Sequence, residues 1–105
     1  MDQRMLKQMQ QQAMQMQQKM QKAQEELANE RVTASSGGGA VTVEMNGHHE
    51  VLSVTLDPDA VSPDDVEMLQ DMLITAFNEA LAKAQEAAQK KMSAATGGLN
   101  IPGLF

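Results

Sequence analysis

The sequence predicts an α+β fold with a long helix over residues 1–29, two to three antiparallel strands over residues 31–57, and a second long helix over residues 63–95. An apolar heptad predicts the first helix, alternation of apolar and polar residues predicts the strands, and a serine followed by a proline predicts the start of the second helix. The chain has 105 residues, so we expect one small domain over residues 1–96. Residues 97–105 are apolar and interrupted by glycine and proline, which predicts a flexible tail.

The first helix carries apolar residues at alternating spacings of three and four positions, which we call the seam. A period of 3.5 residues favours packing against another helix with a left-handed crossing. A helix built largely of Met and Gln is not stable alone, so the seam needs a partner. The seam consists of Leu6, Met9, Ala13, Met16, Met20, Ala23 and Leu27.

The strand region contains two alternating stretches, residues 40–45 and 50–56. Asn46 and Gly47 between them predict a hairpin turn, and Asp57 with Pro58 ends the second stretch. A further short strand is expected near Val32, before the three glycines at 37–39. A hairpin is marginal alone, so its apolar face should pack on the helices. The expected apolar face consists of Val41, Val43, Met45, Leu52, Val54 and Leu56.

The second helix has a strong start signal. Ser62 supplies an N-cap, Pro63 suits the first helical position, and Asp64 and Asp65 complement the helix dipole. Its apolar residues change from large to small along the chain, so its distal half is expected to approach a neighbour closely. This stripe consists of Val66, Leu69, Leu73, Phe77, Ala80, Ala84 and Ala87.

Composition excludes several classes of protein. The chain has no cysteine, which excludes disulfides and thiolate metal sites and favours a reducing compartment, the cytoplasm. It has no signal-like segment and no apolar run near the roughly 20 residues of a membrane span, so we expect no membrane association. Aromatic residues make up 2%, so the stacking platforms that bind single-stranded nucleic acid are missing.

We find no catalytic, cofactor or metal-binding motif, and the sequence predicts that the protein is not an enzyme. His48 and His49 are adjacent on the expected turn, and two such side chains without a converging third ligand make no zinc site. The aspartates after residue 56 lack the spacing of a calcium loop. Three consecutive glycines precede a strand and no Lys-Ser or Lys-Thr follows them, so they are no phosphate-binding loop.

Charge is strongly segregated along the chain. The net charge is -6, yet residues 25–79 hold twelve of the carboxylates and only Arg31 among the cations, whereas both ends are basic. A local basic field attracts an anionic partner whatever the total charge. If the first helix runs into the sheet and the second runs out of it, the basic ends meet in space. This expectation places Arg4 and Lys7 near Lys90 and Lys91, and Lys19 and Lys22 nearer Lys83.

These cations admit two interpretations. Lysines that contact phosphates release counterions without reading bases, which predicts duplex binding with weak sequence preference. The alternative is that the same charges complement a helix dipole and keep a heptad helix soluble. A different class of function also fits the plan, because two antiparallel helices flanking a hairpin describe a helix-based protein-interaction module or a prefoldin-like chaperone subunit.

Five segments together resemble a known family. They are residues 16–27 (MQQKMQKAQEEL), 38–47 (GGAVTVEMNG), 54–58 (VTLDP), 69–80 (LQDMLITAFNEA) and 96–99 (TGGL), with Met92 in addition. In them the chain resembles the YbaB/EbfC family of small bacterial nucleoid-associated proteins, and the resemblance spans nearly the whole chain.

The resemblance implies a homodimer in the cytoplasm and nucleoid. Its protruding, coiled-coil-like helices would form tweezers around double-stranded DNA, with a role in nucleoid organisation and gene regulation and with no cofactor or metal. Carried over to this chain, the DNA contacts fall on the cations available on the two helices. These are Arg4, Lys7, Lys19, Lys22, Lys83, Lys90 and Lys91.

Overall fold

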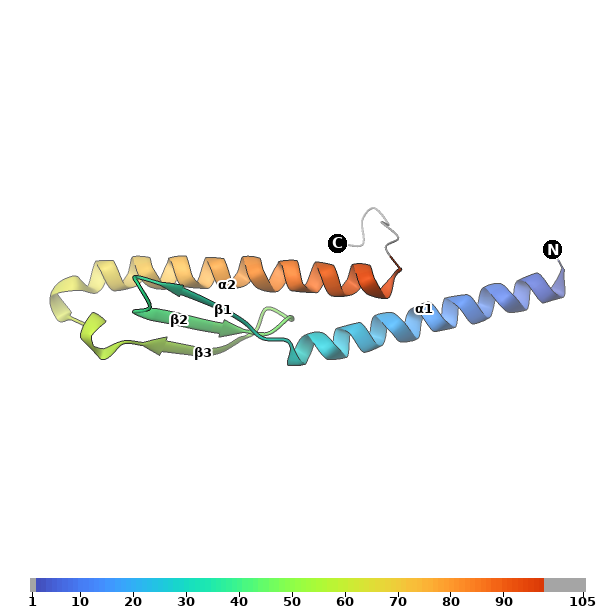
Figure 1. The fold of residues 1–105 in the computed structure, drawn as a ribbon, viewed down its shortest axis with the longest axis horizontal. Coiled ribbons are helices and arrows are strands. Elements are labelled where there is room, and N and C mark those ends of the chain that lie inside the picture. The colour runs from blue at the N-terminus through green and yellow to red at the C-terminus, as the bar shows by residue number, and fades with distance from the viewer. Residues whose placement is uncertain (1, 98–105) are drawn as a thin grey trace.

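The computed structural model describes residues 2–97 and confirms the order helix, strands, helix (Figure 1). Met1 and the expected tail beyond Gly97 lie outside the described residues. The molecule is elongated, with extents of 74 × 23 × 15 Å. Its elements are α1 (Gln3–Asn29), β1 (Val32–Ser36), β2 (Val41–Met45), β3 (Val51–Leu56), two short 3-10 helices at Pro58–Ala60 and Pro63–Asp65, and α2 (Val66–Ala95).

The sheet is antiparallel with strand order β1-β2-β3. The expected third strand near Val32 is confirmed as β1, which pairs with β2 from Val32 opposite Met45 to Ser36 opposite Val41. The triple glycine forms the turn between them, with φ of 63°, 69° and 97°, a region that glycine enters without strain. Ser62 Oγ accepts a hydrogen bond from the Asp64 amide at 3.3 Å, so the expected cap belongs to the short helix that leads into α2.

The main core lies between α2 and the strands β1 and β2. Small residues at a spacing of four on α2 let the helix approach the sheet closely, as the change from large to small residues predicted. Ala76 is buried there although the expected stripe omitted it, whereas Val66, which the stripe included, is exposed. The buried cluster consists of Ala34, Val41, Val43, Met45, Ala76, Ala80 and Ala84.

The expected burial of β3 is wrong for two of its three residues. Only Leu56 packs against the main core, while Leu52 and Val54 are 42% and 41% exposed. Val54 pairs with Val43 and shares its face of the sheet, but α2 covers β1 and β2 and leaves this third strand bare. A register shift between Glu44 and Met45 also puts Val51, and not Leu52, opposite Met45. The alternation along β3 therefore does not decide its burial.

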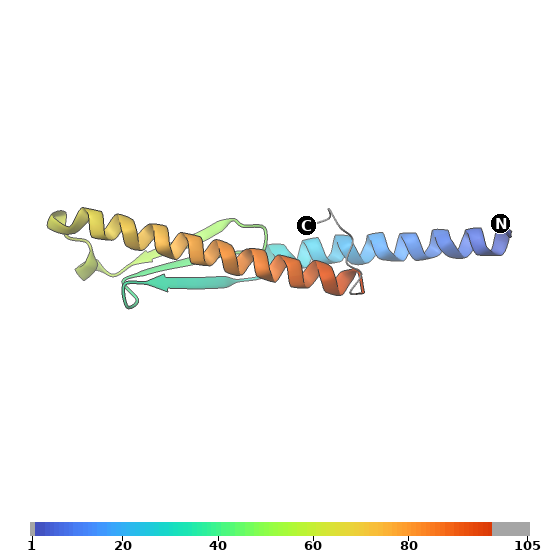
Figure 2. The ribbon, with the colours of Figure 1, turned by 90° about the horizontal axis from the view of Figure 1, so that it is seen from above.

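A second, smaller core joins the C-terminal part of α1 to the end of α2. It contains Ala23, Leu27 and Met92, so the expected seam is confirmed as a helix contact over its last two turns. Its N-terminal half has no partner among the described residues, and Leu6 is 48% exposed. Figures 1 and 2 show why: α1 projects well beyond the point where α2 ends. None of the helices in residues 2–97 is long and apolar enough to cross a membrane.

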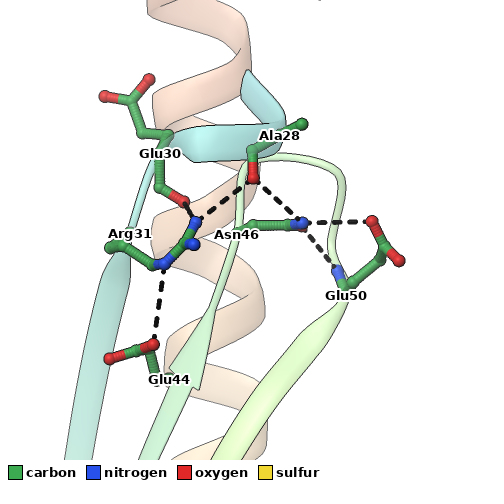
Figure 3. A network of polar contacts seen from close by, with 6 residues as sticks. All are labelled: Ala28, Glu30, Arg31, Glu44, Asn46 and Glu50. Carbon is green, nitrogen blue, oxygen red and sulfur yellow. Dashed lines mark hydrogen bonds and ion pairs between the residues drawn. The ribbon is translucent and has the colours of Figure 1, made fainter. Parts of the chain in front are cut away.

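A polar network fixes the junction between α1 and the sheet (Figure 3). The carbonyl oxygen of Ala28 accepts hydrogen bonds from the Arg31 guanidinium at 3.2 Å and from the buried Asn46 amide at 3.4 Å. Asn46 also donates to the Glu50 carboxylate at 3.1 Å, and Arg31 forms an ion pair with Glu44 at 3.7 Å. The last turn of α1 is thereby bonded to the β2–β3 turn, which sets the direction in which α1 leaves the sheet.

Candidate nucleic-acid interface

The four cations of α1 lie on one face of the helix. Arg4 and Lys22 are 18 residues apart, which is five helical turns, and Lys7 and Lys19 fall within an arc about 120° wide around the same line. The seam occupies the opposite side of the helix. Residues 3–22 contain no carboxylate. We call this set of Arg4, Lys7, Lys19 and Lys22 the cation row.

The cation row is exposed and unpaired. None of its four side chains forms an ion pair or a hydrogen bond with any residue in the described range 2–97. Lys22 acts on Glu26 only through its field, which helps to lower the pKa of that carboxyl group. An anionic partner can therefore reach these side chains without breaking an existing contact.

The three lysines of α2 are all engaged. Lys83 Nζ donates a hydrogen bond to the Thr33 carbonyl oxygen of β1 at 2.7 Å. Lys90 forms an ion pair with Glu86, one turn earlier, at 3.3 Å. Lys91 bridges to α1 through Glu26 at 3.0 Å and Glu30 at 3.7 Å. Lys83 and Lys91 link α2 to other elements, Lys90 pairs within α2, and a phosphate has to compete with all of these contacts.

The same three lysines line an open groove of about 600 Å³ beside β1 and the end of α1. Glu30 and Glu86 stand in its wall, so the groove has mixed charge. The hydrogen bond from Lys91, and then its charge, hold the pKa of Glu26 below its ordinary value. In return, the hydrogen bond to Glu26 raises the pKa of Lys91 above its ordinary value. Both partners are charged at neutral pH and offset one another.

The expected meeting of the basic ends is wrong. The structure places Lys91 against Glu26 and Glu30, and Lys7 lies 19 residues before Glu26, about 28 Å along the helix. Lys83 is bonded to β1 at Thr33 and does not approach Lys19 or Lys22. The reason is that the first half of α2 packs against the sheet, so only the last turns of α2 contact α1. The cations form two separate groups, one on each helix.

Sequence reasoning missed the carboxylates that pair with the α2 lysines. Glu26 lies in the last turns of α1 beside the seam residue Leu27, and Glu30 is the C-cap residue that follows the helix. Charged residues that flank an apolar seam commonly form ion pairs with the facing helix. Aligning the seam with the C-terminal turns of α2 would have revealed the partners of Lys91.

The turn histidines serve the fold. A ring nitrogen of His48, Nε2, is hydrogen-bonded to the Gln24 carbonyl oxygen of α1 at 2.8 Å, and His49 takes a positive φ of 66° at the turn. Within residues 2–97, no three His, Cys, Asp or Glu side chains are grouped so that they could hold a metal ion. His48 thus reinforces the same junction as Asn46.

Comparison with known proteins places this geometry in context. A model of the YbaB/EbfC DNA-binding family matches residues 2–99, which confirms the resemblance seen in the five sequence segments. A nucleoid-associated protein of Chloroflexus aurantiacus is 57% identical over 105 residues, all of both chains. A nucleoid-associated protein of Desulforamulus reducens is 58% identical over 81 residues, 77% of each chain. The matched family is a DNA-binding family and not a family of enzymes, as the sequence predicted.

A solved structure shares the fold. The crystal structure of the uncharacterized protein HP0035 from Helicobacter pylori matches with a TM-score of 0.68 and 26% identity. The match covers 86% of this chain and 91% of that chain. The extended arrangement of helix, three strands and helix is therefore present in a protein of distant sequence.

Proposed function

The chain belongs to the YbaB/EbfC DNA-binding family, and from this premise we propose that it grips the phosphate backbone of double-stranded DNA with the cation row of α1. The protein would act in the cytoplasm, on the nucleoid, and contribute to nucleoid organisation and gene regulation. The observation that carries the proposal is the state of the cation row, which is exposed, has no side-chain partner within residues 2–97 and lies on one face of a projecting helix.

The chemistry of the row favours backbone contacts over base reading. Three of its members are lysines, which bind phosphate as point charges and carry no sequence information. Arg4 alone offers the bidentate geometry that reads guanine. Arg4 and Lys22 lie about 27 Å apart along the axis, so one helix can contact phosphates on successive turns of a duplex. We therefore expect weak sequence preference.

The remainder of the molecule orients the contact. Twelve carboxylates lie in residues 25–79, which form the end of α1, the sheet and the first half of α2. Because α1 projects away from this acidic region, a duplex is attracted to the free part of α1 and repelled from the sheet. Lys83, Lys90 and Lys91 belong to the same proposed site, with a smaller contribution because each must first leave its partner.

We further propose that two copies associate through the uncovered strand β3. Val51, Leu52 and Val54 are each more than two-fifths exposed there, on a strand with one free edge. A small domain gains stability by burying such a surface against a second copy. A dimer formed in this way carries two α1 helices, and two cation rows can hold a duplex as tweezers do.

Fluorescence anisotropy of a labelled mixed-sequence duplex at several salt concentrations tests the DNA contact. The α1 variant combines Arg4→Gln, Lys7→Gln and Lys22→Gln, and the matched α2 variant combines Lys83→Gln, Lys90→Gln and Lys91→Gln, so that each removes three cations. Each phosphate that the protein no longer neutralises should reduce the slope of log K against log salt by about 0.9. We expect the larger reduction in the α1 variant. An unchanged slope in that variant would remove α1 from the site.

Light scattering tests the second copy. The wild-type protein should have the mass of a dimer, and Val54→Asp should shift it towards the monomer because a carboxylate would be buried in the contact. Glu67→Asp, an exposed change on α2, is the control. A monomeric wild-type protein that still binds DNA would contradict the tweezers while leaving the cation row in place.

The exposed half of the seam supports one other function, that of a helix-based protein-interaction or prefoldin-like chaperone module. Apolar side chains such as Leu6 and Met9 on a projecting helix are suited to gripping an apolar client. The two functions differ in their response to salt, because apolar binding persists at high salt whereas phosphate contacts weaken steeply.

A further inference from the structure

The N-terminal half of the seam is an apolar surface without a partner among the described residues. Leu6 and Met9 are 48% and 54% exposed, whereas Leu27 on the same seam is 2% exposed. Seam residues in this half lie on the side of α1 opposite the cation row, so the proposed DNA contact does not cover them. A projecting helix of Met and Gln needs such a partner to remain helical.

A groove of about 690 Å³ lies at the inner end of this surface. It is formed where α2 ends and α1 continues alone. Met92, one of its lining residues, lies three positions before Ala95, the last residue of α2. The groove is lined by Ala13, Met16, Gln17, Met20, Gln21, Gln24 and Met92.

We propose that residues 98–105 of the same chain pack into this groove and along the free half of the seam. These residues lie outside the described part of the chain and follow directly on Gly97, which comes five positions after Met92 of the groove wall. Their sequence, GLNIPGLF, has four large apolar side chains and no charged side chain, so it matches an apolar surface bordered by glutamines. Gly97 has a φ of 68°, which lets the chain turn away from the axis of α2.

The lengths agree with this placement. Eight extended residues span up to about 26 Å, whereas the seam from Met16 to Leu6 is about 15 Å long. Pro102 cannot continue a helix and favours the extended backbone that reaches farthest. Methionine side chains are flexible and polarisable, so they can adapt to an irregular peptide better than a β-branched surface can. The tail would thus close the seam and leave the cation row open.

Methionine oxidation tests the proposal on the full chain. The protein is treated with dilute hydrogen peroxide, and sulfoxide formation at each methionine is followed by mass spectrometry. The tail variant carries Leu99→Ser, Ile101→Ser, Leu104→Ser and Phe105→Ser. We expect Met9 and Met16 to oxidise several-fold faster in this variant than in the wild type. Met14, off the seam, and Met68, at the far end of α2, are more than half exposed and should oxidise equally in both.

Dilution distinguishes the tail from a second copy on the seam. Protection by the tail of the same chain does not depend on protein concentration, whereas protection by a second copy falls on dilution. Equal rates at Met9, Met16 and Met14 in the wild type, or rates at Met9 and Met16 that the tail variant leaves unchanged, would overturn the proposal.

Engineered cysteines give a second, direct readout, because the natural chain has none. Ala13→Cys with Ile101→Cys should form an intramolecular disulfide readily under mild oxidation. The matched pair Gln11→Cys with Ile101→Cys places the first thiol on the cation-row side of α1 and should cross-link at least several-fold more slowly. Equal rates of disulfide formation for the two pairs would show that residues 98–105 do not pack preferentially on the seam.

Discussion

The cation row of α1 and the lysines of α2 carry the same charge in opposite surroundings. Members of the cation row have no side-chain partner in residues 2–97, whereas Lys83, Lys90 and Lys91 contact a carbonyl oxygen or carboxylates within 4 Å. A count of basic residues treats both sets alike. The structure teaches that a cation is available to an anionic ligand only when the fold does not already use it.

The two ends of the seam differ in the same way. Leu27 is buried between α1 and α2, and Leu6 projects beyond the end of α2. The sequence repeats one pattern over both, but only the C-terminal end has α2 beside it. The firmly packed end anchors the helix, and the projecting end is left for contacts outside residues 2–97.

Leu27→Ala compared with Leu6→Ala should give the largest effect. Truncating the buried leucine leaves a cavity in the small core and should lower the free energy of unfolding by about 2–5 kcal/mol. Truncating the half-exposed leucine should cost less than about 1 kcal/mol. Urea denaturation followed by circular dichroism measures both. Equal losses would contradict the contrast between the two ends.

Asn46→Ala should destabilise the anchored end next most strongly. It removes the amide that serves Ala28 and Glu50 and leaves the buried junction short of hydrogen bonds, for a loss of about 1–3 kcal/mol. Asn78→Ala, on the exposed side of α2, is the control and should be near neutral. A near-neutral result at Asn46 would mean that water replaces its contacts.

Releasing Lys91 should convert a paired cation into a free one. In Glu26→Gln with Glu30→Gln, Lys91 loses both ion-pair partners, and the slope of log K against log salt for duplex DNA should steepen by about 0.9 if it gains one phosphate. The control, Glu67→Gln with Glu79→Gln, changes the net charge equally without freeing a lysine. Similar slopes in both double variants would mean that any gain in DNA binding comes from the change in net charge alone.

The pH dependence of the Glu26–Lys91 pair should be the smallest effect. Lys91 lowers the pKa of Glu26 below 4.5, so the stability that the pair contributes is present above that pH and is lost as the pH falls through the lowered pKa. The raised pKa of Lys91 keeps the contribution present below pH 10.5, and it is lost as the pH rises through the raised pKa. Thermal melts of Glu26→Gln should be less sensitive to acid than those of the wild type. If the melting temperatures of the wild type and of Glu26→Gln fell in parallel with decreasing pH, the result would contradict the contribution of the ion pair.

Periodicity predicted the elements of this fold well. The helix expected at residues 1–29 is observed as Gln3–Asn29, and the helix expected at 63–95 is observed as Val66–Ala95 after a short 3-10 turn. The Asn46-Gly47 turn and the short strand near Val32 are also where the sequence placed them. Local patterns suffice for these features because turn chemistry and the spacing of apolar residues act within a few positions.

The placement of the helices and strands relative to one another was not predictable from these local patterns. A heptad shows which side of a helix is apolar, but it does not show which residues of the partner helix lie opposite which seam residues. The ion pair of Lys91 with Glu26 was therefore missed. Alternation shows which residues of β3 share a face, but it does not show that α2 is too narrow to cover a third strand. The α1 contribution to the candidate site followed from sequence, and the engagement of Lys83, Lys90 and Lys91 required the structure.

Gly47 gives the junction a mechanical role. Its amide donates to the Leu27 carbonyl oxygen at 2.9 Å, and an added Cβ would lie 2.6 Å from the Leu27 side chain, so the turn and the helix end interlock. From this pivot to Arg4 the helix extends about 35 Å, and a tilt of about 5° would displace Arg4 by about 3 Å. α1 is thus a lever whose fulcrum is the backbone hydrogen bond between Gly47 and Leu27 at the edge of the sheet. In the dimer proposed above, the width between the N-terminal ends of the two α1 helices would be set at this pivot, about 35 Å from Arg4.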